Sequence, residues 1–133
     1  MTKTTVALMA KARQAVVSAR LLLEAGDVDG ACNRAYYAMF DAARAAIIAS
    51  KAPVSLDIAR THGGLIAAFS LHLVKNGPIP HEFGRLLNRA EEIRLVADYR
   101  GDVVGLADAR EMVDQAERFV TLIRNLFFLS QGQ

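Results

Sequence analysis

The chain has 133 residues, a mass of 14.4 kDa and a formal net charge of only +2. This length is sufficient for one sizeable hydrophobic core, so we expect one domain over residues 1–133. The sequence contains no basic run or tail, which argues against a protein that coats nucleic acid nonspecifically.

Composition also bears on secondary structure and location. Abundant alanine, with 3 prolines and no tryptophan, favours helix throughout. Charged residues interrupt the most apolar windows, Asp41 and Arg44 in one and Arg118 and Arg124 in another. No window reaches the ~20 apolar residues of a membrane span, and the N-terminal residues carry no secretion-signal pattern. With a single Cys32 and hence no internal disulfide, we expect a cytoplasmic protein without a membrane segment.

The first two predicted helices form an antiparallel hairpin. The first spans about residues 4–25 and ends at Gly26, which suits a left-handed cap. Asp27 or Asp29 begins the second, which runs to about Ser50, and so short a connection makes the two helices antiparallel. A stripe of small side chains at steps of three and four on the second helix lets another helix approach closely: Ala31, Ala35, Ala38, Ala42, Ala45 and Ala49.

Three further helices complete the expected fold. The third covers about residues 55–76 and either begins at Thr61 or bends there, because Gly63–Gly64 weakens it. The fourth begins with Pro80 and precedes a polar loop over residues 98–105. A repeat of apolar residues predicts the fifth over residues 106–127. The sequence therefore predicts an all-α, up-and-down bundle of about five helices.

The second predicted helix also carries a motif that packing alone does not require. Residues 33–40 read Asn-Arg-Ala-Tyr-Tyr-Ala-Met-Phe, which resembles the signature helix of small prokaryotic HEPN-domain proteins. Those are all-helical domains often encoded beside a minimal nucleotidyltransferase. Residues 60–65 (Arg-Thr-His-Gly-Gly-Leu) and 94–99 (Arg-Leu-Val-Ala-Asp-Tyr) fit the same subgroup. The resemblance covers most of the chain and implies a HEPN-like bundle.

The resemblance also implies a ligand and a partner. It implies a non-catalytic nucleotide- or RNA-binding module, the partner of a minimal nucleotidyltransferase in a toxin–antitoxin-type system. The candidate ligand-binding residues are Arg34, Tyr37, His62, Arg94, Asp98 and Tyr99. In this interpretation the arginines hold phosphate, and a tyrosine stacks on a base. The alternative is a buried network in which Arg34 or Arg94 pairs with Asp98 or Asp41.

An enzyme is the second hypothesis. Family members that act as ribonucleases carry an arginine four to six residues before a histidine. No arginine has that spacing before His62, His72 or His81, since Arg60 precedes His62 by only two residues. We therefore expect weak or no ribonuclease activity. The alternative is a metal-independent ribonuclease with a composite site of His62 and Arg34, while His72 and His81 fit packing or surface positions.

The remaining expectations concern metals, cofactors and assembly. Because the chain lacks Glu-x-x-His pairs, zinc-type spacings and a phosphate-binding glycine loop, we expect no metal and no cofactor. Hydrophobic residues make up 53% of the chain, more than a small bundle can bury, which predicts a homodimer or a tight partner. A structural homo-oligomer without a ligand is the third hypothesis.

One more polar surface lies on the fourth predicted helix. One face carries a mixed set of side chains: Arg85, Asn88, Arg89 and Glu92. Either this face is solvated and has internal ion pairs to Glu91 and Glu92, or it is a ridge that contacts phosphate. The intervening acids favour the first interpretation, since they cancel much of the positive field.

Overall fold

The computed structural model describes residues 3–97 and 104–128, and every regular element within them is a helix. In chain order the elements are α1 (Lys3–Glu24), α2 (Val28–Ser50), α3 (Leu56–Arg60), α4 (His62–Ala68), the π-helix η1 (Phe69–Lys75), α5 (His81–Leu95) and α6 (Leu106–Phe127). The expected all-α helical bundle is therefore confirmed. None of the described helices has the length and apolar character needed to cross a bilayer.

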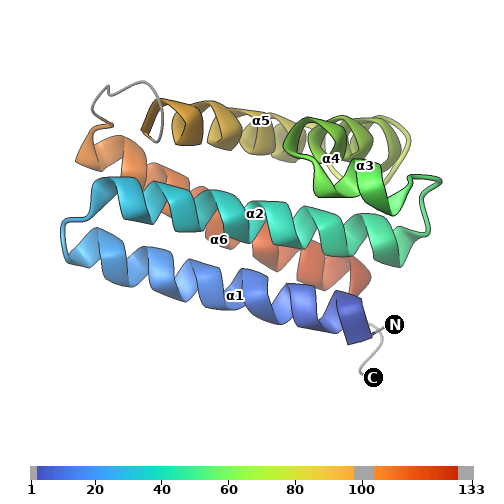
Figure 1. Cartoon of the computed structure of the whole chain (residues 1–133), viewed down its shortest axis with the longest axis horizontal. Helices are drawn as coiled ribbons and strands as arrows, with labels where there is room; N and C mark the ends of the chain where they lie inside the picture. Colours follow the sequence, from blue (N-terminus) through green and yellow to red (C-terminus); the bar gives the residue numbers. More distant parts are fainter. Residues whose placement is uncertain (1–2, 98–103, 129–133) are drawn as a thin grey trace.

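Helix α2 lies at the centre of the arrangement (Figure 1). It packs lengthwise against α1 on one side and against α4, η1 and α5 on the other, and α6 runs behind it in this view. The predicted hairpin of α1 and α2 is confirmed: Gly26 has a φ of +84° and ends α1. The Asp27 side chain then accepts a hydrogen bond from the Gly30 backbone N–H at 2.9 Å, which caps α2.

The alanine stripe explains how α2 accommodates neighbours on both sides. Five of its six predicted members have no exposed surface: Ala31, Ala35, Ala38, Ala42 and Ala45. Ala49, near the end of the helix, is half-buried. On α1, Ala12 and Ala19 are likewise fully buried. Small side chains on both helices bring their backbones close together, so the packing leaves little room for a larger side chain.

The third predicted helix is instead divided into three elements. Thr61 adopts an extended conformation, with φ −84° and ψ 147°, between α3 and α4. Its hydroxyl accepts a hydrogen bond from the Gly64 backbone N–H at 3.0 Å and donates one to the Ile58 carbonyl oxygen at 3.0 Å. A Cβ atom at Gly64 would overlap both groups, so glycine is needed there. The break makes His62 the first residue of α4. Pro80 caps α5, one residue before its predicted role as the first helical residue.

We predict that Ala35→Leu lowers the free energy of unfolding by about 1–3 kcal/mol, because the added carbons overfill a packed interface. Urea denaturation of the purified protein measures this change. Ala10→Leu is the matched control, since Ala10 is exposed on α1 and should accept leucine within about 0.5 kcal/mol. Equal stability of the two variants would contradict the tight packing of α2.

Candidate functional site

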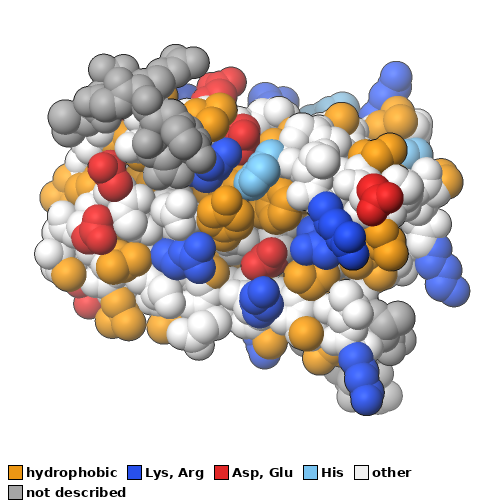
Figure 2. Space-filling model, in the orientation of Figure 1, with side chains coloured by type: hydrophobic (Ala, Val, Ile, Leu, Met, Phe, Trp, Pro, Cys, Tyr) orange, Lys and Arg blue, Asp and Glu red, His pale blue; other side chains and the backbone are white. Residues whose placement is uncertain are grey.

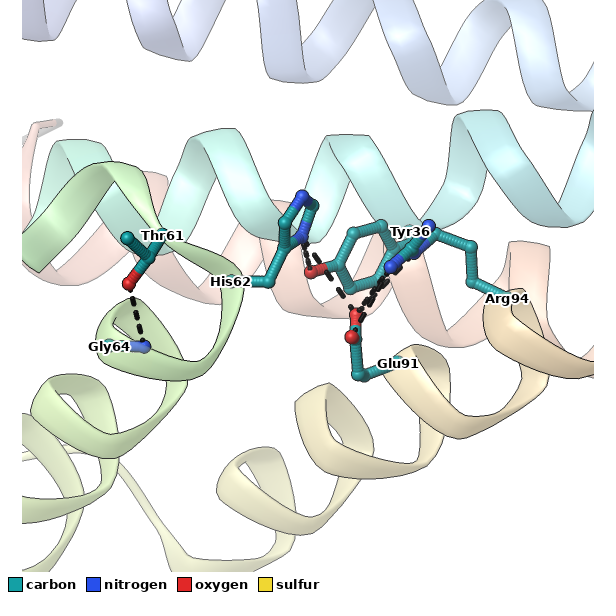
Figure 3. A network of polar contacts seen from close by, with 6 residues as sticks. All are labelled: Tyr36, Thr61, His62, Gly64, Glu91 and Arg94. Atoms are coloured by element: carbon teal, nitrogen blue, oxygen red, sulfur yellow. Dashed lines mark hydrogen bonds and ion pairs between the residues drawn. The ribbon is translucent and has the colours of Figure 1, made fainter. Parts of the chain in front are cut away.

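His62, at the start of α4, lies among aromatic side chains of α2, of which Figure 3 draws Tyr36. Its ring centroid is 5.5 Å from that of Tyr36, 5.9 Å from that of Tyr37 and 4.9 Å from that of Phe40. The Tyr36 hydroxyl is 2.6 Å from His62 Nδ1, a hydrogen-bond distance. The Thr61 cap fixes the first turn of α4, so it also fixes where this imidazole meets α2.

Glu91 and Arg94 of α5 extend this contact into a four-residue network (Figure 3). Glu91 Oε2 is 3.9 Å from His62 Nδ1, and the Arg94 guanidinium donates to both Glu91 oxygens at 3.2 and 3.3 Å. The same guanidinium lies 4.8 Å from the centre of the Tyr36 ring. Arg94 is only 6% exposed, and its pairing with Glu91 offsets the cost of burying its charge.

Burial keeps the Tyr36 hydroxyl protonated. Burial raises the pKa of Tyr36 far above its usual range, and the adjacent Glu91 carboxylate raises it further. The hydroxyl is therefore able to donate to Nδ1 of His62 or to accept from it, according to the tautomer of the imidazole. In either tautomer the network engages Nδ1. The ring's other nitrogen, Nε2, has no hydrogen bond among the described residues, and the side chain is 38% exposed.

A second group of polar side chains lies on the outer face of α2. Arg34, Tyr37, Asp41 and Arg44 follow one another at steps of three and four, and all are half-buried. The Arg34 guanidinium lies 5.4 Å from the centre of the Tyr37 ring. Since the Tyr37 ring in turn contacts that of His62, a cation, an aromatic ring and an imidazole lie next to one another. We call Arg34, Tyr37 and His62 the α2–α4 surface.

Positive charge exceeds negative charge around Asp41. Burial raises the pKa of the Asp41 carboxyl, while Lys11, Arg44 and Arg34 nearby act in the opposite direction. Three cations thus surround one half-buried carboxylate. In Figure 2, Lys and Arg side chains surround a hydrophobic area with a histidine near the middle of the visible face.

The structure brings some of the predicted site residues together. His62 and Arg94 join one network, and Arg34 and Tyr37 lie beside it on α2. Asp98 and Tyr99 lie outside the described residues.

The structure does not pair Arg34 with Asp41, one of the two carboxylates considered from the sequence. Arg34 is half-buried, and within the described ranges its hydrogen bonds go to Asn33 Oδ1, at 3.2 and 3.4 Å, while the other carboxylate considered, Asp98, lies outside those ranges. The rise between residues 34 and 41 of a helix is about 10.5 Å, which disfavours a direct ion pair, whereas Asn33 is adjacent.

Sequence reasoning missed Tyr36 and Glu91 as polar partners of His62. The sequence gives Tyr36 no polar role and places Glu91 in an ion pair on a solvated face. The spacing of Glu91 and Arg94, three residues apart on one helix face, is the signal that could have identified their pairing. In the described part of the chain no three His, Cys, Asp or Glu side chains are grouped closely enough to hold a metal ion.

One known protein family and several known proteins match most of the length of this chain. Residues 5–126 match the family described as HEPN domain. A UPF0332 protein of Gloeobacter violaceus is 35% identical over 126 residues, which cover 93% of this chain and 94% of that protein. A UPF0332 protein of Thermotoga maritima is 33% identical, covering 87% of this chain and 85% of that protein. A Methanocaldococcus jannaschii protein named "Putative toxin" is 30% identical, covering 89% of this chain and 84% of that protein.

We predict that Tyr36→Phe lowers the free energy of unfolding by about 1–2 kcal/mol, because the buried network loses its hydroxyl while the ring is retained. Chemical denaturation at neutral pH measures the loss. Tyr37→Phe is the control: its ring is half-buried, no described residue is hydrogen-bonded to its hydroxyl, and the change should stay within about 0.5 kcal/mol. A neutral Tyr36→Phe would show that the hydroxyl does not stabilise the fold.

We predict that Asp41→Asn raises the free energy of unfolding at pH 7. Burial raises the pKa of Asp41 in the folded state, so the fold favours the protonated carboxyl. This contribution to the free energy of unfolding is complete in acid and is lost as the pH rises through the folded-state pKa. Asparagine resembles the protonated carboxyl, so the gain should vanish below about pH 4. Unfolding curves from pH 3 to pH 8 provide the test. Asp57→Asn, at a side chain that is 95% exposed, should give no such gain.

Proposed function

Since this chain belongs to the HEPN domain family, and within it to the UPF0332 proteins, we propose that it is a nucleotide- or RNA-binding module of a toxin–antitoxin-type system. The α2–α4 surface formed by Arg34, Tyr37 and His62 is its ligand-binding site. The module binds its ligand without cutting it.

The adjacency of three side chains carries this proposal. The Arg34 guanidinium lies against the Tyr37 ring, and that ring lies against His62. A guanidinium and an imidazole are suited to phosphate oxygens, and the face of a tyrosine is suited to stacking on a base. The excess of cations over carboxylates around Asp41 adds a positive potential that attracts such a ligand.

The position of Arg94 supports binding rather than catalysis. Cleavage of RNA requires a cation that stabilises charge on the phosphate during the attack. Arg94 belongs to the network of His62, but it is buried and its guanidinium is bonded to the Glu91 carboxylate. Its charge is therefore largely neutralised before any substrate arrives.

A metal-independent ribonuclease is the second candidate function, and one observation favours it. Tyr36 and Glu91 lie at Nδ1 of His62, so the network orients the imidazole through one nitrogen. Nε2 is then available to exchange a proton with a 2′-hydroxyl, as a general base does. Arg34 would have to supply the charge stabilisation in this case.

We also propose a protein partner for this module. The relative named "Putative toxin" supports a toxin–antitoxin context, in which a minimal nucleotidyltransferase is the partner we propose. We also propose a homodimer. Helix α1 exposes three large apolar side chains on one face, Val6, Val17 and Leu21, at 56%, 51% and 61% of their surface. An apolar stripe of this kind is suited to a second copy or to another protein.

We predict that Arg34→Gln weakens binding of a fluorescein-labelled single-stranded RNA by about tenfold, because one charged phosphate contact is lost. Tyr37→Ala should have a similar effect through lost stacking. Fluorescence anisotropy measures both, and Arg13→Gln, an exposed change on α1, should bind like the unchanged protein. Equal affinity of all variants would refute the α2–α4 surface as the binding site.

The same samples separate the two candidate functions. We expect no cleavage of the RNA on a denaturing gel, with or without a chelator. Chelator-resistant cleavage that His62→Ala abolishes and His72→Ala preserves would establish the ribonuclease instead. Light scattering of these samples gives the mass and so decides between monomer and dimer.

A further inference from the structure

A groove of about 580 Å³ lies between η1 and α5, away from the α2–α4 surface. Its lining includes an apolar part and a polar part. The side chains relevant to binding are Ser70, Leu71, Val74, Lys75, His81 and Arg85.

The charges of this groove have one sign. None of the residues that line it is acidic, and its two cations, Lys75 and Arg85, are exposed. Neither cation is in an ion pair within the described ranges. The acidic residue of the first turn of α5, Glu82, is instead bonded to Arg118 of α6 at 2.8 Å. In a chain whose net charge is only +2, the groove is a local concentration of uncompensated positive charge.

The shape of the groove is suited to a ligand larger than a single ion. Gly84 packs so closely on η1 that a Cβ atom there would be 3.3 Å from Val74 Cγ2. Leu71 is 46% exposed, so the groove also offers an apolar surface. The first turn of α5 begins beside it at His81, and its backbone N–H groups have no side-chain cap. A ligand with phosphate groups and a flat apolar part matches this combination.

The four residues on one face of α5 that the sequence offered as an alternative phosphate-contacting ridge do not all line this groove. Arg85 lines the groove between η1 and α5, whereas Arg89 and Glu92 line a separate cavity beside Val104. The side chain of Asn88 donates to the Gly84 carbonyl oxygen at 3.0 Å and so is engaged within α5. The second cation of the groove is Lys75, which comes from η1.

We propose that this groove is a second phosphate-binding site, in which Lys75 and Arg85 hold the phosphate groups of a nucleotide or of an RNA backbone. It shares no residue with the α2–α4 surface. The groove therefore binds phosphate whether or not Arg34 and His62 contact a ligand.

The test compares two double variants of equal net charge. Lys75→Gln/Arg85→Gln removes the groove's cations, and Lys3→Gln/Arg110→Gln removes two exposed cations outside it. Anisotropy of labelled oligouridylate is measured over a series of salt concentrations. The groove variant should bind roughly tenfold more weakly at low salt, and its logarithmic salt dependence should fall by about 1.4, for two lost phosphate contacts. The control should match the unchanged protein. Thermal melting checks that all variants are folded.

Calorimetry with ATP and with pyrophosphate distinguishes the sources of the phosphate. Loss of ATP binding in the groove variant, with RNA binding unchanged, would identify a free nucleotide, and the reverse would identify an RNA backbone. Either result supports the groove. Equal effects of the two double variants on every probe, or no binding of any of these probes, would overturn it. Because Arg34→Gln is measured separately, failure of the groove and failure of the α2–α4 surface give different results.

Discussion

The requirement to satisfy a phenol, a carboxylate and a guanidinium inside an apolar bundle determines how α2, α4 and α5 meet. Tyr36 is fully buried and Arg94 nearly so, and Glu91 lies between them. Each polar group would be costly to bury alone, but together they neutralise and hydrogen-bond one another. His62 closes the network from the side of α4. A shift of any of the three helices would therefore leave a buried polar group without its partner.

Arg34 and Arg94, from the first and last of the three stretches that resemble the family, have opposite surroundings. Arg94 points into the bundle and is bonded to Glu91, while Arg34 lies half-buried against the outer ring of Tyr37. Adjacent tyrosines on α2 make this possible, because successive residues of a helix point about 100° apart. Tyr36 faces the core and Tyr37 faces the outer surface, and both rings contact His62. The imidazole therefore lies where the buried network meets the proposed ligand surface.

Local features of the fold could be read from the sequence, and long-range ones could not. Gly26, Asp27 and the end of α2 are set by neighbouring residues, and their predicted roles are confirmed. The alanine stripe also predicted close packing, because spacing alone puts those residues on one face. The contacts of His62 with Glu91 and Tyr36 depend on how α4 and α5 approach α2. No local sequence pattern indicates that approach. The break at Thr61 was predicted only in part. Gly63–Gly64 indicated a weak point in the third predicted helix, but the capping of α4 by Thr61 was not predicted.

The π-helix η1 has a consequence for how this fold tolerates changes in chain length. Its wider turns, seen in the hydrogen bond from the Asn76 N–H to the Leu71 carbonyl oxygen at 3.2 Å, hold more residues per turn than an α-helix does. The element lies between two fixed points, the Thr61 cap and the buried Ile79. Loss of one residue from it could be absorbed by a return to α-helical turns. Such an indel would reshape the groove beside α5 and leave His62 in place, so the two surfaces can diverge independently during evolution.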